Sequence, residues 1–110
     1  MAKGTYVQKG ERIDYTNSTD SAIGYKDILP LVTRIAIALE DIAVGATGTL
    51  GVTGIVELAA ENTVAFDVGD QLYWDSTNGR LTKTSSGNIP AGWNTEPKTS
   101  SGAVARVKIG

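Results

Sequence analysis

The stretch TGTLGVTGIVEL, residues 47–58, decides the fold class. Its large apolar side chains alternate with threonines and a glutamate, as expected for an extended strand with one face toward a core. Three glycines recur at every third residue, and glycines inside a strand are typical of a bulge, a bend or a close backbone approach. We therefore predict one long strand that curves at its glycines, as a small barrel requires. The side chains expected to share one core with Leu72 are Leu50, Val52, Val56 and Leu58.

The segments on either side extend this β pattern. Residues 31–39 follow a proline and are rich in β-branched side chains, which favours a strand over a helix. Residues 70–75 and 80–84 flank a Ser-Thr-Asn-Gly sequence, which is typical of a hairpin with a type I turn and a left-handed glycine. Residues 40–45 predict one short helical turn closed by a glycine, and residues 85–101 predict mostly loop.

The C-terminal residues 103–109 alternate again. Ala105, Val107 and Ile109 are predicted to point into the core, and Arg106 and Lys108 to point into solvent.

The chain has 110 residues, which suits one domain, and 13 of them are glycines. We predict an all-β fold, in which residues 21–110 form a single small β-barrel-like or β-sandwich domain with short helical turns. Residues 1–20 are polar apart from a few scattered apolar side chains, and they predict either an extended N-terminal arm or a first strand.

Composition excludes many functions. The chain has no cysteine and no histidine, so a disulfide, a thiolate metal site, a thiol nucleophile and an imidazole base are all ruled out. Asp67, Asp70 and Asp75 lack the spacing of a calcium loop, and we predict no catalytic residue, no bound metal and no cofactor. The net charge of −2 argues against a nucleic-acid partner, and no apolar run is long enough to predict a membrane span.

The aromatic residues offer one candidate contact. Tyr73 and Trp74 are neighbours on a predicted strand, so their rings should point to opposite faces. Trp93 lies in a predicted loop bounded by glycine and proline, where core packing and a protein interface are both open. Base stacking is disfavoured, because acidic side chains rather than basic ones surround these aromatics.

Five stretches, spread in order over nearly the whole chain, carry a family resemblance. They are YVQKGERID (6–14), DIAVGATG (41–48), GIVEL (54–58), VGDQLYWD (68–75) and GRLT (79–82). No single stretch is a specific motif, but their order, spacing and total length together resemble the small capsid cement, or head decoration, proteins of tailed phages. The long segment of residues 87–102 departs from that pattern.

The resemblance implies a structural protein without catalysis. Such a protein is made in the cytoplasm of the bacterial host and then binds the major capsid protein on the outer surface of the mature virion. It commonly does so as a homo-trimer, and it contacts neither nucleic acid nor membrane. The residues expected to contact the capsid or a neighbouring subunit are Tyr6, Val7, Gln8, Ile13 and Tyr15 of the arm, with Trp93 as an interface aromatic.

Two other functions remain open at this point. An SH3-like or oligonucleotide-binding-like small barrel that binds a peptide or nucleic acid shares the hairpin pattern around Gly69 and Asp70. A carboxylate-dependent enzyme is the weaker alternative, because no nucleophile and base occur in a recognisable arrangement.

Overall fold

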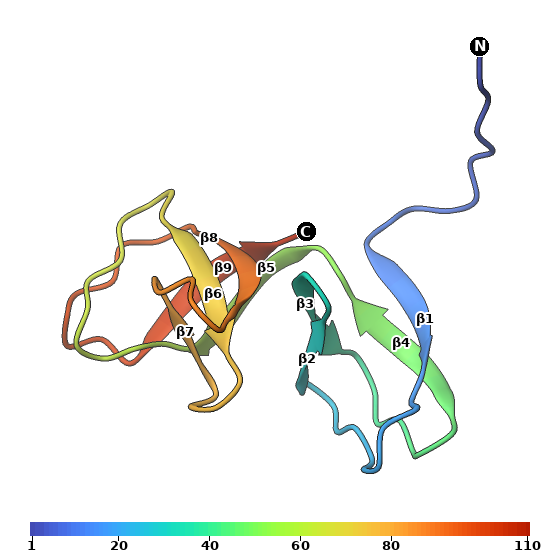
Figure 1. Cartoon of the computed structure of the whole chain (residues 1–110), viewed down its shortest axis with the longest axis horizontal. Helices are drawn as coiled ribbons and strands as arrows, with labels where there is room; N and C mark the ends of the chain where they lie inside the picture. The colour runs from blue at the N-terminus through green and yellow to red at the C-terminus, as the bar shows by residue number, and fades with distance from the viewer.

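The computed structural model describes all 110 residues, and its regular structure is entirely β. Nine strands form two antiparallel sheets of four and five strands, which lie beside each other in Figure 1. Neither sheet closes into a barrel, so the all-β prediction is confirmed in its two-sheet form rather than its barrel form. The N-terminal residues precede the first strand and lead away from both sheets (Figure 1). The structure contains no helix of the length and apolar character needed to cross a membrane.

The four-stranded sheet has the order β1-β4-β3-β2 and its own small core. Tyr15, Leu31 and Val52 pack against this core from its margin. The strands are β1 (Arg12–Thr16), β2 (Ile28–Leu31), β3 (Arg34–Ala38) and β4 (Thr47–Gly51). The buried members of the core are Ile23, Leu29, Ala36, Ala38, Ile42 and Leu50.

The five-stranded sheet has the order β5-β9-β8-β6-β7 and a second, larger core. Ile35 of β3 belongs to this second core, so β3 is the strand that joins the two sheets. The strands are β5 (Gly54–Ala59), β6 (Gln71–Asp75), β7 (Arg80–Thr82), β8 (Ile89–Asn94) and β9 (Val104–Ile109). The other buried members are Ala60, Phe66, Leu72, Leu81, Ala91, Ala105, Val107 and Ile109.

The single strand predicted for residues 31–39 is wrong, because the chain reverses inside it. Leu31 pairs with Arg34, so Val32 and Thr33 form a two-residue turn between β2 and β3. The turn contains no glycine, asparagine or aspartate, and the sequence pattern therefore did not reveal it.

The long strand predicted for residues 47–58 is also wrong in its extent. It is interrupted at Val52 and Thr53, and its two halves belong to different sheets. Leu50 is therefore buried in the core of the four-stranded sheet, whereas Val56 and Leu58 pack against the other core with Leu72. The prediction of one shared core is wrong, although a change of direction at the glycines is what the structure shows.

The hairpin predicted for residues 70–84 is confirmed as β6 and β7, and Gly79 has the expected positive φ of 64°. The alternation predicted for the last strand is also confirmed, with Ala105, Val107 and Ile109 buried in β9. Residues 85–101 lie mostly outside strands, as predicted, but they also contain β8, which the sequence did not predict and which pairs with both β6 and β9.

No helical turn forms at residues 40–45. Ile42 instead makes an isolated β-bridge with Ile23, in which each backbone nitrogen donates to the other residue's carbonyl oxygen. The buried side chain of Asn17 donates to the Ile42 carbonyl, and the backbone nitrogen of Gly45 donates to the Asn17 carbonyl. These contacts satisfy the polar groups of the loop without a helix.

Candidate functional site

The predicted contact residues of the N-terminal segment fall into two groups. Tyr6, Val7 and Gln8 precede β1 and are exposed, with 81% of Tyr6 and 84% of Val7 accessible to solvent. Ile13 and Tyr15 lie on β1, where Tyr15 is half-buried against the core of the four-stranded sheet. The structure therefore does not gather the five residues into one site. It presents two of them as large side chains that no part of the chain covers.

The inner boundary of the exposed segment is set by backbone pairing. The backbone nitrogen of Val52 donates to the carbonyl of Glu11 at 3.0 Å, which extends the β1–β4 ladder by one residue beyond Arg12. Before that point, the segment makes one side-chain hydrogen bond, from Gln8 Nε2 to the Arg12 carbonyl at 3.4 Å. Residues 1–9 are thus attached to the body only through their own C-terminal end.

Trp93 lies on β8 rather than in the predicted loop, and 43% of it is exposed. Trp93 is paired with Gln71 of β6 on one side and with Lys108 of β9 on the other. Lys108 is in turn paired with Ile55 of β5. The result is a row across four strands on the outer face of the sheet, with the Lys108 stem between two exposed apolar side chains. We call Ile55, Lys108 and Trp93 the outer row.

Sequence reasoning missed Ile55, although a signal for it existed. Ile55 lies two residues from both Thr53 and Glu57, so the alternation of a strand puts its side chain on the same face as these polar residues. Its 63% exposure places a large apolar side chain on that face. Large exposed apolar side chains in a row are more informative about contacts than single ones.

An open groove of about 770 Å³ lies where β4 passes into β5. Ile37, Leu39 and Val56 line its floor, and charged side chains that include Glu11 and Lys26 stand at its margin. Its lining contains no histidine or cysteine, and the chain holds no cluster of three acidic side chains that could bind a metal ion. The groove therefore offers surface for contact rather than a set of catalytic groups.

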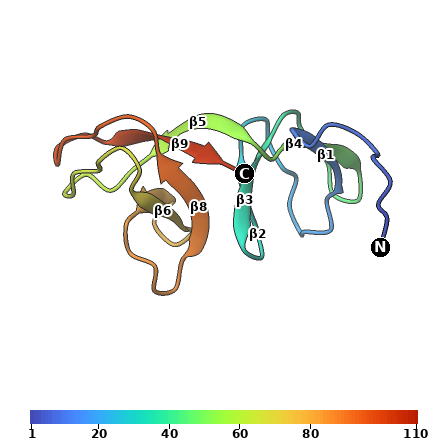
Figure 2. The ribbon, with the colours of Figure 1, turned by 90° about the horizontal axis from the view of Figure 1, so that it is seen from above.

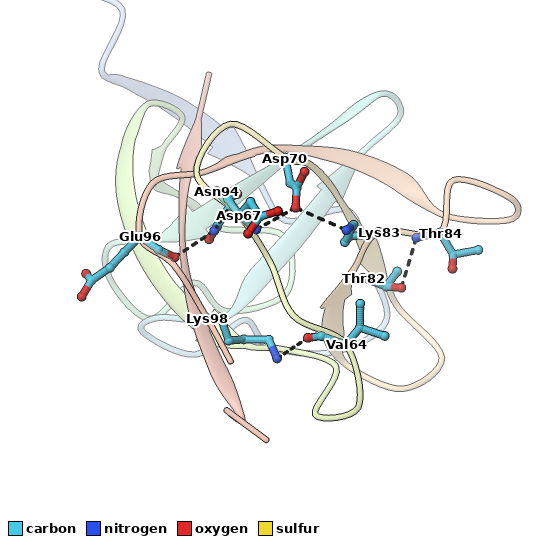
Figure 3. Close-up of polar contacts among 9 residues, drawn as sticks. All are labelled: Val64, Asp67, Asp70, Thr82, Lys83, Thr84, Asn94, Glu96 and Lys98. Atoms are coloured by element: carbon cyan, nitrogen blue, oxygen red, sulfur yellow. Dashed lines mark hydrogen bonds and ion pairs between the residues drawn. The ribbon is translucent and has the colours of Figure 1, made fainter. Parts of the chain in front are cut away.

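Two of the aspartates considered above as ligands, Asp70 and Asp75, stabilise turns instead, and Asp70 is drawn in Figure 3. Asp70 Oδ2 accepts a hydrogen bond from the backbone nitrogen of Asp67 at 2.7 Å and lies 3.4 Å from the Lys83 ammonium. The backbone hydrogen bond from Asp67 has the largest effect and lowers the pKa of Asp70; desolvation opposes it, and the contact with Lys83 lowers the pKa further. Asp75 caps the hairpin turn through Asn78, which likewise lowers its pKa. The carboxylates of Asp70 and Asp75 are thus local structural groups.

The long loops beside β8 are fixed by two buried polar side chains, also drawn in Figure 3. Asn94 Nδ2 donates to the carbonyls of Asp67 and Glu96 at 3.0 and 2.8 Å. Lys98 is buried and its ammonium donates to the Val64 carbonyl at 2.6 Å. This end of the molecule is consequently held by structural hydrogen bonds.

Comparison with known proteins decides the family. A family model described as phage cement protein matches residues 7–109, which is almost the entire chain. The chain belongs to the phage cement protein family. No curated protein and no solved structure matches it.

Membership in this family defines the general role of the protein. A cement protein is a structural, non-catalytic component that binds the capsid, lies on the surface of the virion and stabilises the shell. The resemblance found in the five sequence stretches is thereby confirmed, and the small-barrel and enzyme alternatives are not supported. The open question is which surfaces of this cement protein make the contacts.

Proposed function

We propose that this cement protein attaches to the major capsid protein on the outside of the mature shell through its N-terminal arm, here residues 1–11. The observation that carries the proposal is the exposure of Tyr6 and Val7 on a segment that packs against nothing in its own chain. Fixing the backbone of such a segment costs about 1–2 kcal/mol per residue, which burial of its own side chains does not offset. A partner that buries them supplies what the isolated chain lacks.

The expected mode is addition of a strand. An extended arm can pair with the edge of a sheet in the shell protein, where backbone hydrogen bonds give affinity and alternate side chains enter pockets. Tyr6 and Gln8 would then face one side and Val7 the other. Ile13 and Tyr15 continue the same chain along β1 and would border the contact.

Capsid stabilisation then follows from mass action. A ligand that binds only the mature lattice stabilises it by about 2.7 kcal/mol per site when its free concentration is a hundred-fold above Kd. Because a shell offers many equivalent sites, a modest affinity at each is sufficient. This argument needs no reaction chemistry from the protein.

We further propose that the protein acts as a homo-trimer and that Trp93 lies between subunits. Support comes from the outer row, which puts a tryptophan, a residue type enriched in interface hot spots, on an open sheet face. The net charge of −2 disfavours nucleic acid as the partner. Light scattering of the purified protein should give three times the chain mass of 11.5 kDa.

Deletion of residues 1–9 tests the role of the arm. The truncation keeps the Glu11–Val52 hydrogen bond, so the melting temperature should stay within a few degrees of the full chain while binding to expanded shells falls. Tyr6→Ser with Val7→Ser should reproduce the loss without shortening the chain, and Lys3→Ser is the matched control. A truncated protein that decorates shells as well as the full chain would refute the proposal.

A further inference from the structure

The tip of the β2–β3 hairpin has an unusual backbone. Val32 has a φ of +42°, although β-branched residues rarely adopt this left-handed region. Of the two turn residues, only Val32 has a positive φ, and hairpin turns with that pattern usually place glycine there. The pairing of Leu31 with Arg34 on either side holds Val32 in this conformation.

Nothing within the chain compensates for this strain. The Val32 side chain is 93% exposed, which is more than any other large apolar residue except the N-terminal methionine. Thr33 and Arg34 next to it are exposed as well, so Val32 contributes no packing to the four-stranded sheet. Strained residues that the surrounding structure holds in place are concentrated at sites of contact with other molecules.

The neighbouring residue shows how the tip can bind. Pro30 lies on β2, the outermost strand of its sheet, and is exposed. The backbone nitrogen of Ala38 donates to the carbonyl of Asp27. Along β2, the backbone polar groups point alternately toward β3 and away from it, and those of Pro30 point away from it. Since proline has no backbone N–H, a foreign strand cannot pair fully at this edge. The tip must therefore be recognised through its side chains.

We propose that the tip of the β2–β3 hairpin is a second contact with the shell protein, in which Val32 enters an apolar pocket. Figure 2 shows this hairpin standing out from the band formed by β1, β4, β5 and β9. Pro30 borders the contact on one side, and Arg34, the one charged residue at the tip, suits a neutral or acidic rim around the pocket. The proposal rests on the capsid-binding role, and the shell is the partner because cement proteins bind the capsid.

Because Val32 is strained, its replacement should weaken shell binding without lowering the melting temperature. Val32→Gly removes both the unfavourable side chain and the anchor, and Val32→Asn replaces it by a polar residue that tolerates a positive φ. Both variants should melt at the temperature of the parent or above it, yet bind expanded shells about ten-fold or more weakly, as loss of one buried valine predicts. Val32→Ile keeps the anchor and should bind as the parent does. Val68→Asn, at an exposed valine with ordinary backbone geometry, is the matched control.

Co-sedimentation with expanded shells and thermal melting together separate the outcomes. Normal shell binding by both Val32→Gly and Val32→Asn overturns the proposal. A lowered melting temperature also overturns it, because unfolding of the variants would then account for their weaker shell binding. If these variants instead change the native mass measured by light scattering, the tip contacts a second copy and the assignment to the shell is wrong. If the parent protein itself fails to bind shells, the capsid-binding role fails and not only the tip.

Discussion

Lys98 is expected to be the most important single polar side chain for stability. Its ammonium donates to the carbonyls of Val64, Thr99 and Gly102 at 2.6, 2.9 and 2.9 Å, and it lies 4.8 Å from the centre of the Phe66 ring. No carboxylate lies within ion-pair distance. Lys98→Met keeps the length of the side chain and removes all three donors.

The expected loss of stability depends on which of the three carbonyls remain shielded from water in the variant. A buried acceptor that loses its partner costs about 1–3 kcal/mol, and hydrogen bonds from a charged donor are worth more than neutral ones. Thr99 is exposed, so water can replace the lost donor there, whereas the Val64 and Gly102 carbonyls belong to partly buried residues. Two such acceptors give a loss of about 2–4 kcal/mol, since the variant also avoids burying an ammonium. For a domain of this size, that lowers the melting temperature by about 8–16 °C.

Urea unfolding followed by tryptophan fluorescence, together with thermal melting, measures this loss. Lys26→Met is the matched control, because Lys26 is exposed and its ammonium lies 5.4 Å from the centre of the Tyr25 ring. The control should change the free energy of unfolding by less than about 0.5 kcal/mol. A Lys98→Met variant as stable as the control would refute the reasoning, since the three carbonyls would then be satisfied without the lysine.

Three further predictions concern single positions. A Cβ on Gly92 would lie 1.9 Å from the Lys108 carbonyl oxygen, and its φ is 149°, so Gly92→Ala should lose about 3 kcal/mol or more in urea unfolding. The pKa of Asp70 is lowered in the folded state. Its ionised carboxylate therefore stabilises the fold at a pH above the unfolded pKa near 3.8, and this stabilisation is lost as the pH falls through the lower folded pKa. Asp70→Asn should therefore be less stable than the parent at pH 7, and the difference in urea unfolding should shrink as the pH falls below 3.8. Trp93→Ser should lower the native mass in light scattering, and the resulting monomer should melt no lower than the parent protein. An unchanged mass would exclude Trp93 from the subunit contact.

The parts of the fold that sequence analysis predicted are those set by local chemistry. The β6–β7 hairpin depends on Asn78 and Gly79 at the turn, and Gly79 adopts the positive φ that its position requires. The burial pattern of β9 follows from strict alternation over residues 104–109. Each feature depends on residues that are close together along the chain, where turn geometry and side-chain period are decisive.

The errors arose where tertiary contacts override local pattern. Pro90 and Gly92 made β8 resemble a loop, yet Pro90 is tolerated because β8 pairs with β9 only at Trp93 and Asn94. Gly92 is needed for the close approach of β8 to β9. The β2–β3 turn was hidden because its first residue is a valine instead of the expected glycine. Val32, which we propose as a second contact, therefore lies where the local rule is broken.

The two sheets divide the proposed contacts between them. The arm continues into β1, and Val32 lies between β2 and β3, so both proposed shell contacts belong to the four-stranded sheet. Trp93, proposed to lie between subunits, belongs to the five-stranded sheet, which has a separate core.

The two proposals together predict coupled effects on shell binding, because a trimer presents three hairpin tips and a monomer presents one. Val32→Asn should therefore weaken shell binding more in the parent trimer than in the Trp93→Ser monomer. Each variant measured alone and together by co-sedimentation, at a concentration where the parent is half-bound, gives the coupling energy. An equal loss in the trimer and in the monomer would mean that the three tips of a trimer do not bind the shell together, and one of the two proposals would then be wrong.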